Sequence, residues 1–411
     1  MVQRKKVLMI SPILPDPNRT GAHRRAAAHL SALSELCDVY LLIYTSLKGE
    51  PCVPEGTMRA CMGIETIPVD PVTQSELAQK VPGATLLLDM IRPDRFWGLP
   101  DLRKMADALQ RFGVPRFDTL FAFRLRSALA VTVYQAARGG ISDQQIVDFD
   151  DIESIKLKRF LKSASNNDGT EWTLVHRLRA ARIRRLEDRT MKKFDATLVC
   201  SDEDRDTLVG RCPGSVVAVI PNTVDLIDAS EEETSVGHVN LLFVGTMSYP
   251  PNIDAVTWFV SEIFPLIERR SELVCKLSIV GFDPTPEIKA LASDRVEITG
   301  AVESVTPYYQ RSHLVVAPIR FGGGTRIKIL EAMSAGRAVV ATTIGAEGIS
   351  VQDGVDLVLA DRAEDFASAC VRLLEANSLR RSIAEAGRRT VKEKYTLAAT
   401  RGEYRKLVGV E

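Results

Sequence analysis

Short, continuous apolar runs alternate with segments of helical periodicity along the whole chain. The first run lies within a strand expected at residues 6–11, a helical pattern follows at 22–36, and the next run covers 39–44. Apolar runs without a polar alternation are typical of parallel strands that are covered on both faces. A strand, a helix and a second strand in this order make a βαβ unit. The pattern therefore predicts an α/β protein.

The alternation continues on both sides of an acidic segment, 223–237, which ends in Gly237 and reads as a linker. Before this segment we expect further strands at 64–69, 119–123, 145–148, 196–200 and 216–220. After it we expect strands at 239–244, 277–280, 296–299, 314–317 and 337–342. The sequence thus predicts two doubly wound domains, residues 1–222 and 238–392, and a last helix within 393–411.

Composition limits the classes of partner and compartment. The 411 residues contain 53 Lys and Arg and 53 Asp and Glu, so no bulk attraction to nucleic acid is expected. No apolar run approaches the roughly 18–20 residues of a membrane span, and the apolar stretch at 7–10 is too short for a secretion signal. Seven cysteines, an odd number without a C-x-x-C pair, suggest a reduced cytoplasmic interior.

The most informative stretch is a glycine-rich loop, 322–324, before a helix expected at 325–334. Adjacent glycines allow positive φ angles and a close approach of a ligand, and a helix N-terminus attracts anions. Arg326, expected in the first turn, would be unfavourable there unless an anion binds. Lys328 and Glu331 share a helix face and could hold a phosphate and a ribose. An ordinary glycine turn with a surface ion pair is the alternative.

Two places in the first domain carry candidate polar groups. Gly21, His23 and Arg24 lie where the loop after the first strand enters a helix, on the side of a parallel sheet where ligands bind. A solvated basic turn is the alternative there. Asp148 and Asp150 form a D-x-D at a strand end, which could bind a divalent metal or form a helix cap or turn.

Two further segments are candidates for contact with a membrane surface. Residues 171–194 are rich in arginine and have an approximate helical apolar stripe, and residues 86–98 combine aromatic and aliphatic groups near a proline. A basic amphipathic helix can rest on anionic lipid, but it can equally be a solvated surface helix. For 86–98 the alternative is a buried helix end.

Several segments resemble family 4 glycosyltransferases of the GT-B fold: GGGTRIKILEAMSAGRAVVAT (322–342), IGAEGI (344–349), FVGTMSYPPN (243–252) and PNTVD (221–225). The resemblance implies two Rossmann-like domains that face each other across a cleft. It also implies a final helix, 393–411, that crosses back to the first domain. The implied donor is a nucleotide-diphosphate sugar, without a metal or further cofactor.

The same resemblance assigns roles to residues of the second domain. It implies that Arg326 and Lys328 stabilise the departing diphosphate as catalytic residues, and that Glu331 binds the ribose. The implied donor-binding residues are Gly245, Thr246, Gly322, Gly323, Gly324, Thr325, Glu331, Gly345 and Glu347. The chain departs from the family at Gly323, where many members carry a glutamate that contacts the transferred sugar. How the sugar ring is held is therefore left open.

In the first domain the resemblance implies an acceptor side made by Gly21, His23, Arg24, Asp148 and Asp151. The implied function is a retaining glycosyltransferase that acts on a glycan, a lipid-linked or a small-molecule acceptor in surface polysaccharide or glycoconjugate synthesis. A lipid-linked acceptor would place the cytoplasmic protein at the inner face of the cell membrane. Two alternatives stay open: a GT-B nucleotide-sugar epimerase and a non-catalytic partner that binds a nucleotide sugar.

Overall fold

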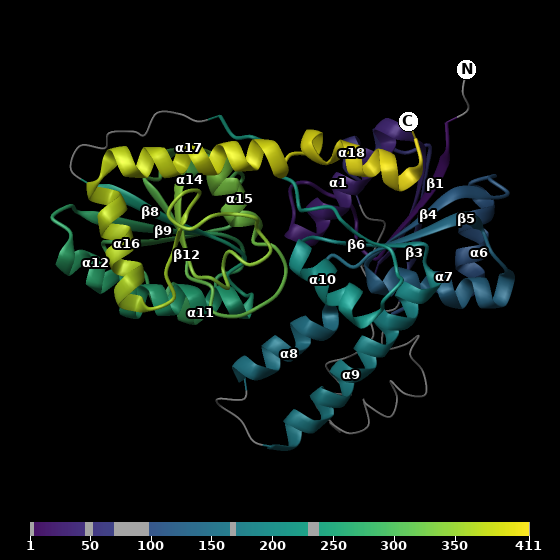
Figure 1. Ribbon diagram of the computed structural model, residues 1–411, viewed down its shortest axis with the longest axis horizontal. Helices are drawn as coiled ribbons and strands as arrows, with labels where there is room; N and C mark the ends of the chain where they lie inside the picture. The colour runs from purple at the N-terminus through teal and green to yellow at the C-terminus, as the bar shows by residue number, and fades with distance from the viewer. Residues whose placement is uncertain (1–3, 46–51, 70–97, 165–169, 229–237, 411) are drawn as a thin grey trace. The chain divides into compact units, whose positions relative to one another are not determined.

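The computed structural model describes residues 4–45, 52–69, 98–164, 170–228 and 238–410 (Figure 1). The chain divides into two compact units, one made by residues 1–220 with 401–411 and the other by residues 221–400. Each unit is a parallel sheet with helices between its strands, so the predicted α/β class is confirmed. Nearly all of the segment 86–98, namely 86–97, lies outside the described residues.

The first unit contains a seven-stranded parallel sheet in the order β3-β2-β1-β4-β5-β6-β7. Its strands are β1 Lys6–Ser11, β2 Asp38–Thr45, β3 Gly63–Pro68, β4 Phe117–Phe123, β5 Ser142–Asp148, β6 Ala196–Val199 and β7 Val217–Val219. Because β1 pairs with both β2 and β4, the winding direction changes between β1 and β4. Ligands of such sheets bind at the carboxyl ends of the strands beside this point.

Eight helices of the first unit lie in the described residues: α1 Gly21–Leu36, α2 Glu55–Arg59, α6 Leu102–Arg111, α7 Arg124–Arg138, α8 Glu153–Ala164, α9 Thr170–Lys193, α10 Asp202–Arg211 and α18 Leu397–Val408, whose residues from 401 onward belong to this unit. Figure 1 shows α8 and α9 side by side, extending away from the sheet of this unit. The basic segment 171–194 therefore does form a helix. No helix in the described part of the chain is both long and apolar enough to span a bilayer.

The second unit contains a six-stranded parallel sheet in the order β10-β9-β8-β11-β12-β13. Its strands are β8 Val239–Val244, β9 Cys275–Val280, β10 Val296–Gly300, β11 Leu314–Ala317, β12 Ala338–Ala341 and β13 Val358–Leu359. Its helices in the described residues are α11 Pro250–Trp258, the π-helix η1 Phe259–Ile263, α12 Phe264–Arg270, α13 Pro286–Lys289, α14 Thr306–Arg311, α15 Ile327–Ser334, α16 Ala363–Glu375 and α17 Asn377–Lys394. Here the winding direction changes between β8 and β11.

Both faces of this second sheet are buried. Along β8, Leu241 and Phe243 pack into a core with α11, α12 and α16, whereas Leu242 and Val244 pack into a second core with α15 and α17. Because successive side chains of a strand point to opposite faces, covering both faces requires apolar residues at every position. This explains the continuous apolar run in the sequence, and it leaves the loops at the strand ends to carry the polar chemistry.

Candidate functional site

The glycine-rich loop follows β11 and precedes α15. Gly322 has a φ of 123° and Gly324 a φ of 74°, and both values lie in the region that favours glycine. The helix begins at Ile327, two residues later than the sequence predicted. Arg326 is its N-cap, with φ −82° and ψ 90°, because the backbone is still extended at this position. The expectation that Arg326 sits inside the first turn was therefore wrong.

Arg326 folds back over the glycine loop. Its Nη1 donates to the carbonyl oxygens of Gly323 and Gly324. The guanidinium thus turns these two carbonyl groups toward itself and places a positive charge at the start of α15, where the helix dipole is positive too. The guanidinium and the positive end of the helix dipole repel each other, and an anion bound between them would stabilise both.

Lys328 reaches from the first turn of α15 to the end of β8 and to α11. Its Nζ donates to Oδ1 of Asn252 at 2.8 Å and lies 3.9 Å from the ring centroid of Phe243. Burial of the ammonium is the largest cause that lowers the pKa of Lys328 to about 7; the charge of Arg326 lowers it too, and Glu331 raises it. At neutral pH an amine with this pKa is only partly protonated. An anion that binds beside it raises the pKa and so favours the charged form.

The turn after β8 is built around the same ammonium group. A Cβ added to Gly245 would lie 2.7 Å from Nδ2 of Asn252 and 3.0 Å from Nζ of Lys328, so a side chain there would displace these two polar groups. Nδ2 of Asn252 donates to the carbonyl oxygen of Thr246 at 2.9 Å. On the other side, Gly281 packs against the carbonyl of Gly245, where a Cβ would overlap the oxygen.

Glu331 lies one turn further along α15 and is buried, with 7% of its surface exposed. The hydroxyl of Tyr309 donates to its Oε2 at 2.9 Å. A surface ion pair between Lys328 and Glu331, the alternative left by the sequence, is therefore excluded because the carboxylate is not at the surface. Tyr309 fixes that carboxylate beside the start of the helix.

Two more predicted donor residues follow β12. The amide of Gly345 donates to Oγ1 of Thr342 at 2.9 Å, and a Cβ on Gly345 would lie 2.7 Å from the carbonyl oxygen of Ala317. Glu347 is partly buried in the next turn. Thr325, in the glycine loop, has a buried hydroxyl oxygen with no hydrogen-bond partner among the described residues. A buried hydroxyl of this kind is available for a ligand.

These groups converge at the change of winding direction. β8, β11 and β12 are neighbours in the sheet, and Gly245, the glycine loop and Gly345 follow their carboxyl ends. In this unit the structure thus brings together residues that are about 100 positions apart in the sequence, and it leaves a cationic cluster of Arg326 and Lys328 among them.

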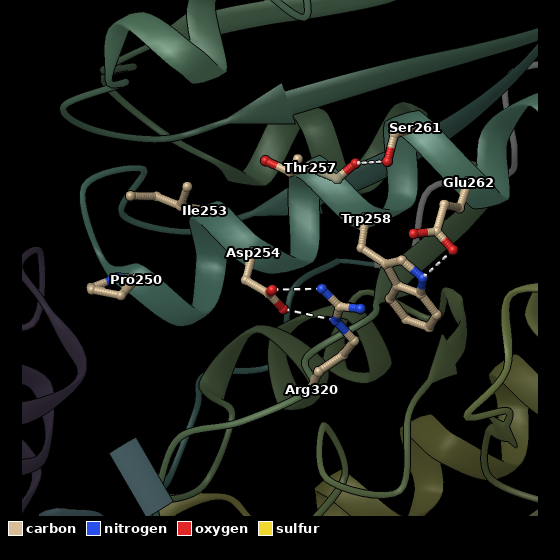
Figure 2. Close-up of a pocket in the computed structure, with 8 residues that line it drawn as sticks. All are labelled: Pro250, Ile253, Asp254, Thr257, Trp258, Ser261, Glu262 and Arg320. Carbon is tan, nitrogen blue, oxygen red and sulfur yellow. Dashed lines mark hydrogen bonds and ion pairs between the residues drawn. The ribbon is translucent and has the colours of Figure 1, made fainter. Parts of the chain in front are cut away.

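A pocket of about 370 Å³ lies beside the start of the glycine-loop segment, along the outer side of α11 and η1 (Figure 2). Within it, Arg320 forms a two-bonded ion pair with Asp254, with Nε–Oδ2 at 2.9 Å and Nη2–Oδ1 at 2.6 Å. Its guanidinium carbon lies 4.9 Å from the ring centroid of Trp258. Helix α11 therefore contacts the glycine-loop segment on both sides of the loop. Asp254 contacts Arg320, which precedes the loop, and Asn252 contacts Lys328, which follows it.

In the first unit, Asp148 is completely buried and forms an ion pair with Arg25. Nε and Nη2 of Arg25 donate to its two carboxylate oxygens, both at 2.8 Å, and Nε2 of His29 donates to it at 2.9 Å. Arg25 and the His29 contact lower the pKa of Asp148, although burial alone would raise it. Nη1 of Arg25 donates to the carbonyl of Ile220 at 2.9 Å. The expected acceptor contact of Asp148 was therefore wrong, because its side chain has no exposed surface.

The other carboxylates of the D-x-D region are also engaged. Nε of Arg124 donates to Oδ2 of Asp150 at 3.0 Å, and both residues have positive φ angles, 70° and 58°. Asp151 forms an ion pair with Lys156 at 2.6 Å and is partly exposed. In the described ranges, no cluster of three or more His, Cys, Asp or Glu side chains could hold a metal ion.

The loop before α1 carries the remaining predicted residues. Gly21 is the exposed first residue of the helix, and Arg24 is partly buried. Nδ1 of His23 is 2.8 Å from Oγ1 of Thr20, and burial lowers the pKa of this histidine. Gly21, His23 and Arg24 thus lie together at the carboxyl end of β1, whereas Asp148 lies beneath the surface.

Sequence reasoning did not foresee the contacts of four residues that hold these groups: Asn252, Tyr309, Arg25 and His29. For the last two a signal existed, because they are four positions apart and share the apolar face of α1 with Ala26 and Leu30. A charged residue on a buried helix face predicts a buried partner. No comparable pattern marked Asn252 or Tyr309, which act on residues 76 and 22 positions away.

The chain is similar to known glycosyltransferases in one segment and in its fold. Residues 238–376 match the family model of glycosyl transferases group 1. The matched residues lie within the second unit. The family resemblance found in the sequence is therefore confirmed. A 137-residue stretch is 28% identical to an uncharacterized 44.6 kDa protein in the cps region of Klebsiella pneumoniae. The stretch covers 31% of this chain and 35% of that relative. The match thus spans about a third of the relative's length.

Solved structures extend the comparison over the full chain. Sucrose-phosphate synthase from Thermosynechococcus elongatus superposes with a TM-score of 0.70 at 16% identity, over 99% of this chain and 100% of that one. HepE from Anabaena, solved in complex with UDP-glucose, gives a TM-score of 0.60 at 14% identity, over 98% and 99% of the two chains. At these identities the likeness shows the fold, and it confirms the GT-B prediction.

Proposed function

We propose that this glycosyltransferase transfers a sugar, with retention of its anomeric configuration, from a nucleotide-diphosphate sugar to a glycan, lipid-linked or small-molecule acceptor. The observation that carries the proposal is the cationic cluster of Arg326 and Lys328 at the N-terminus of α15, where the sheet changes its winding direction. This cluster lies within the residues that match the family model.

The proposed chemistry requires such a cluster. When the bond between the anomeric carbon and the β-phosphate breaks, negative charge grows on the departing diphosphate. Preorganised positive groups and amide donors aimed at that charge are the largest catalytic contribution of this kind of site. We assign this role to Arg326, Lys328, the amides of the glycine loop and the 245–246 turn. We name no nucleophile, since attack on the same face of the sugar needs none from the protein here.

The nucleoside end of the donor is assigned to the buried carboxylate of Glu331, which would accept hydrogen bonds from a ribose diol. Gly345 and Glu347 would complete the donor site from the end of β12. HepE from Anabaena was solved with UDP-glucose, so UDP and its sugars are the first probes. The base and the sugar of the donor are to be found by experiment.

The acceptor is assigned to the first unit, on the loop with Gly21, His23 and Arg24 and on the partly exposed Asp151. The relative encoded in a cps region favours a role in surface polysaccharide synthesis. A lipid-linked acceptor would place the cytoplasmic protein at the inner face of the membrane, and the basic helix α9 is the segment proposed to contact it. The proposed reaction uses no metal.

The test is thermal unfolding of the full chain with UDP, ADP and GDP, with the matching monophosphates, and with their sugars. A ligand that binds only the native state raises the unfolding midpoint by mass action. We expect one diphosphate and its sugars to raise the midpoint in the wild type but not in Arg326→Ala. No shift with any nucleotide would contradict the donor site.

Product analysis then separates the reaction classes. With the donor that binds, transfer to an acceptor with an unchanged anomeric configuration, seen by NMR of the product, supports the proposed enzyme. Conversion of the free nucleotide sugar to an epimer would support an epimerase instead. Binding without transfer, epimerisation or slow donor hydrolysis would support a non-catalytic nucleotide-sugar-binding partner.

A further inference from the structure

We propose that Asn252 is a positioning residue of the donor site, which holds the ammonium group of Lys328 where it meets the donor diphosphate. The inference rests on the proposed function, and it adds a residue that the sequence motifs did not mark. Asn252 lies in α11, 76 positions before Lys328, and is itself 7% exposed. It reaches the lysine from a different element of the same unit.

Both ends of the Asn252 amide are used, and its orientation is fixed by its partners. Oδ1 accepts from Nζ of Lys328 at 2.8 Å, and Nδ2 donates to the carbonyl oxygen of Thr246 at 2.9 Å. An ammonium group can only donate and a carbonyl can only accept, so the reversed amide would lose both bonds. One side chain therefore ties the lysine to the 245–246 turn.

The partner of the ammonium is neutral, and this suits a site for an anion. A carboxylate in the place of Asn252 would neutralise the charge of Lys328 and repel a diphosphate. The amide holds the ammonium by its dipole and leaves the net positive charge available. The ring of Phe243, 3.9 Å from Nζ, adds an attraction that likewise leaves the charge in place.

The ammonium group of Lys328 lies among three neighbours: the amide of Asn252, the ring of Phe243 and the turn at Gly245. A Cβ at Gly245 would lie 3.0 Å from Nζ of Lys328 and 2.7 Å from Nδ2 of Asn252, so the turn, the amide and the ammonium are in close contact. The charged groups that act on Nζ are Arg326, at the N-cap of α15, and Glu331, one turn into that helix. The location of the ammonium is thus set by α11 and the end of β8 rather than by its own helix.

The test compares Asn252→Asp and Asn252→Ala with the wild type, and uses Thr257→Ala as the matched control. Thr257 is exposed on the same helix and lines the pocket of Figure 2, away from Lys328. The first measurement is the pKa of Lys328 in the ligand-free protein, obtained from the pH dependence of its competitive acetylation by peptide mass spectrometry. Asn252→Asp should raise this pKa, Asn252→Ala should lower it, and Thr257→Ala should leave it near 7.

The second measurement is binding of UDP and UMP by calorimetry, with the ADP/AMP and GDP/GMP pairs in the same series. We expect both Asn252 variants to weaken binding of the diphosphate about tenfold or more and binding of the monophosphate by less than twofold. Asn252→Ala removes a bond to a charged group, whereas Asn252→Asp neutralises the ammonium and repels the diphosphate. Turnover should fall with the diphosphate affinity, and Thr257→Ala should match the wild type throughout.

The outcomes separate the inference from the proposed function. An unchanged pKa of Lys328 in both Asn252 variants would overturn the inference, whatever binds. Equal weakening of the diphosphate and the monophosphate would also overturn it, because a role in fold stability alone gives that result. If the pKa responds but the wild type binds no nucleotide, the contact is real and the donor function itself is rejected.

Discussion

The hydroxyl oxygen of Tyr404 lies 2.7 Å from Nδ1 of His29, although 375 positions separate the two residues in the chain. Nε2 of the same ring faces a carboxylate oxygen of Asp148 at 2.9 Å. Because the carboxylate can only accept, Nε2 carries the proton and Nδ1 accepts from Tyr404. The C-terminal helix α18 is thereby joined to α1 through a buried, fully bonded imidazole.

Replacing Tyr404 by phenylalanine should destabilise the first unit. The substitution leaves Nδ1 of His29 buried without a donor, which costs about 1–3 kcal/mol of unfolding free energy. Urea unfolding followed by a probe in the first unit should show a lower midpoint and an unchanged slope. Tyr249→Phe is the control, because Tyr249 is 41% exposed. Equal stability of the Tyr404 variant would contradict the hydrogen bond.

The stability of the first unit should decrease as pH falls below about 6.5. Burial lowers the pKa of His29 from its ordinary value of 6.5, while Asp148 partly offsets this change. The unfolded chain therefore takes up a proton at a pH where the folded ring stays neutral, and stability present above pH 6.5 is lost as pH falls. His29→Gln should reduce the slope of the unfolding midpoint between pH 7 and 5. An unchanged slope would show that other groups cause it.

Donor binding should weaken as pH rises through about 7. The pKa of Lys328 is lowered to about 7 in the free protein, so the charged form that attracts a diphosphate is dominant only below this value. If the charged form alone binds, the dissociation constant rises by up to about tenfold per pH unit above it. The measurement uses a nucleotide sugar, whose diphosphate does not titrate near neutral pH. Lys328→Arg, which stays charged, should give a flat profile.

Glu331→Gln should weaken nucleoside monophosphate and diphosphate by the same factor, about tenfold, if the carboxylate binds the ribose. Both ligands contain the ribose, whereas in the proposed site only the diphosphate would reach the cationic cluster. Calorimetry with UMP and UDP makes the comparison. Glu262→Gln is the control, since Glu262 is exposed in the same unit. An unchanged affinity in Glu331→Gln would reject the ribose contact.

Arg326→Ala should lower turnover more than it weakens binding of the free nucleoside. The guanidinium lies by the glycine loop, where charge would develop on the departing diphosphate, and it also holds the carbonyl groups of Gly323 and Gly324. Initial rates and the affinity for uridine are measured on the same protein. A change confined to the binding of the acceptor would show that the assigned role is wrong.

The strands and the fold class could be predicted because their cause is local. A strand buried on both faces needs an unbroken apolar run, and residues 7–10, 241–244 and 314–317 show it directly. The last helix was likewise predicted, within residues 393–411, and it is observed at Leu397–Val408. The start of α15 was missed by two residues, because the contacts of Arg326 with the loop carbonyls decide where the backbone becomes helical.

The sequence alone determined the α/β architecture, the resemblance to a glycosyltransferase family and the identity of the residues around the glycine loop. The tertiary structure decided what these residues contact. It buried Asp148 with Arg25 and His29, and it set Lys328 against Asn252 and Phe243. Such pairings join side chains from separate strands and helices, so the spacing of residues in the sequence does not identify the partner. The free energy of burying a charge is what selects the partner, and burial exists only after the chain has folded.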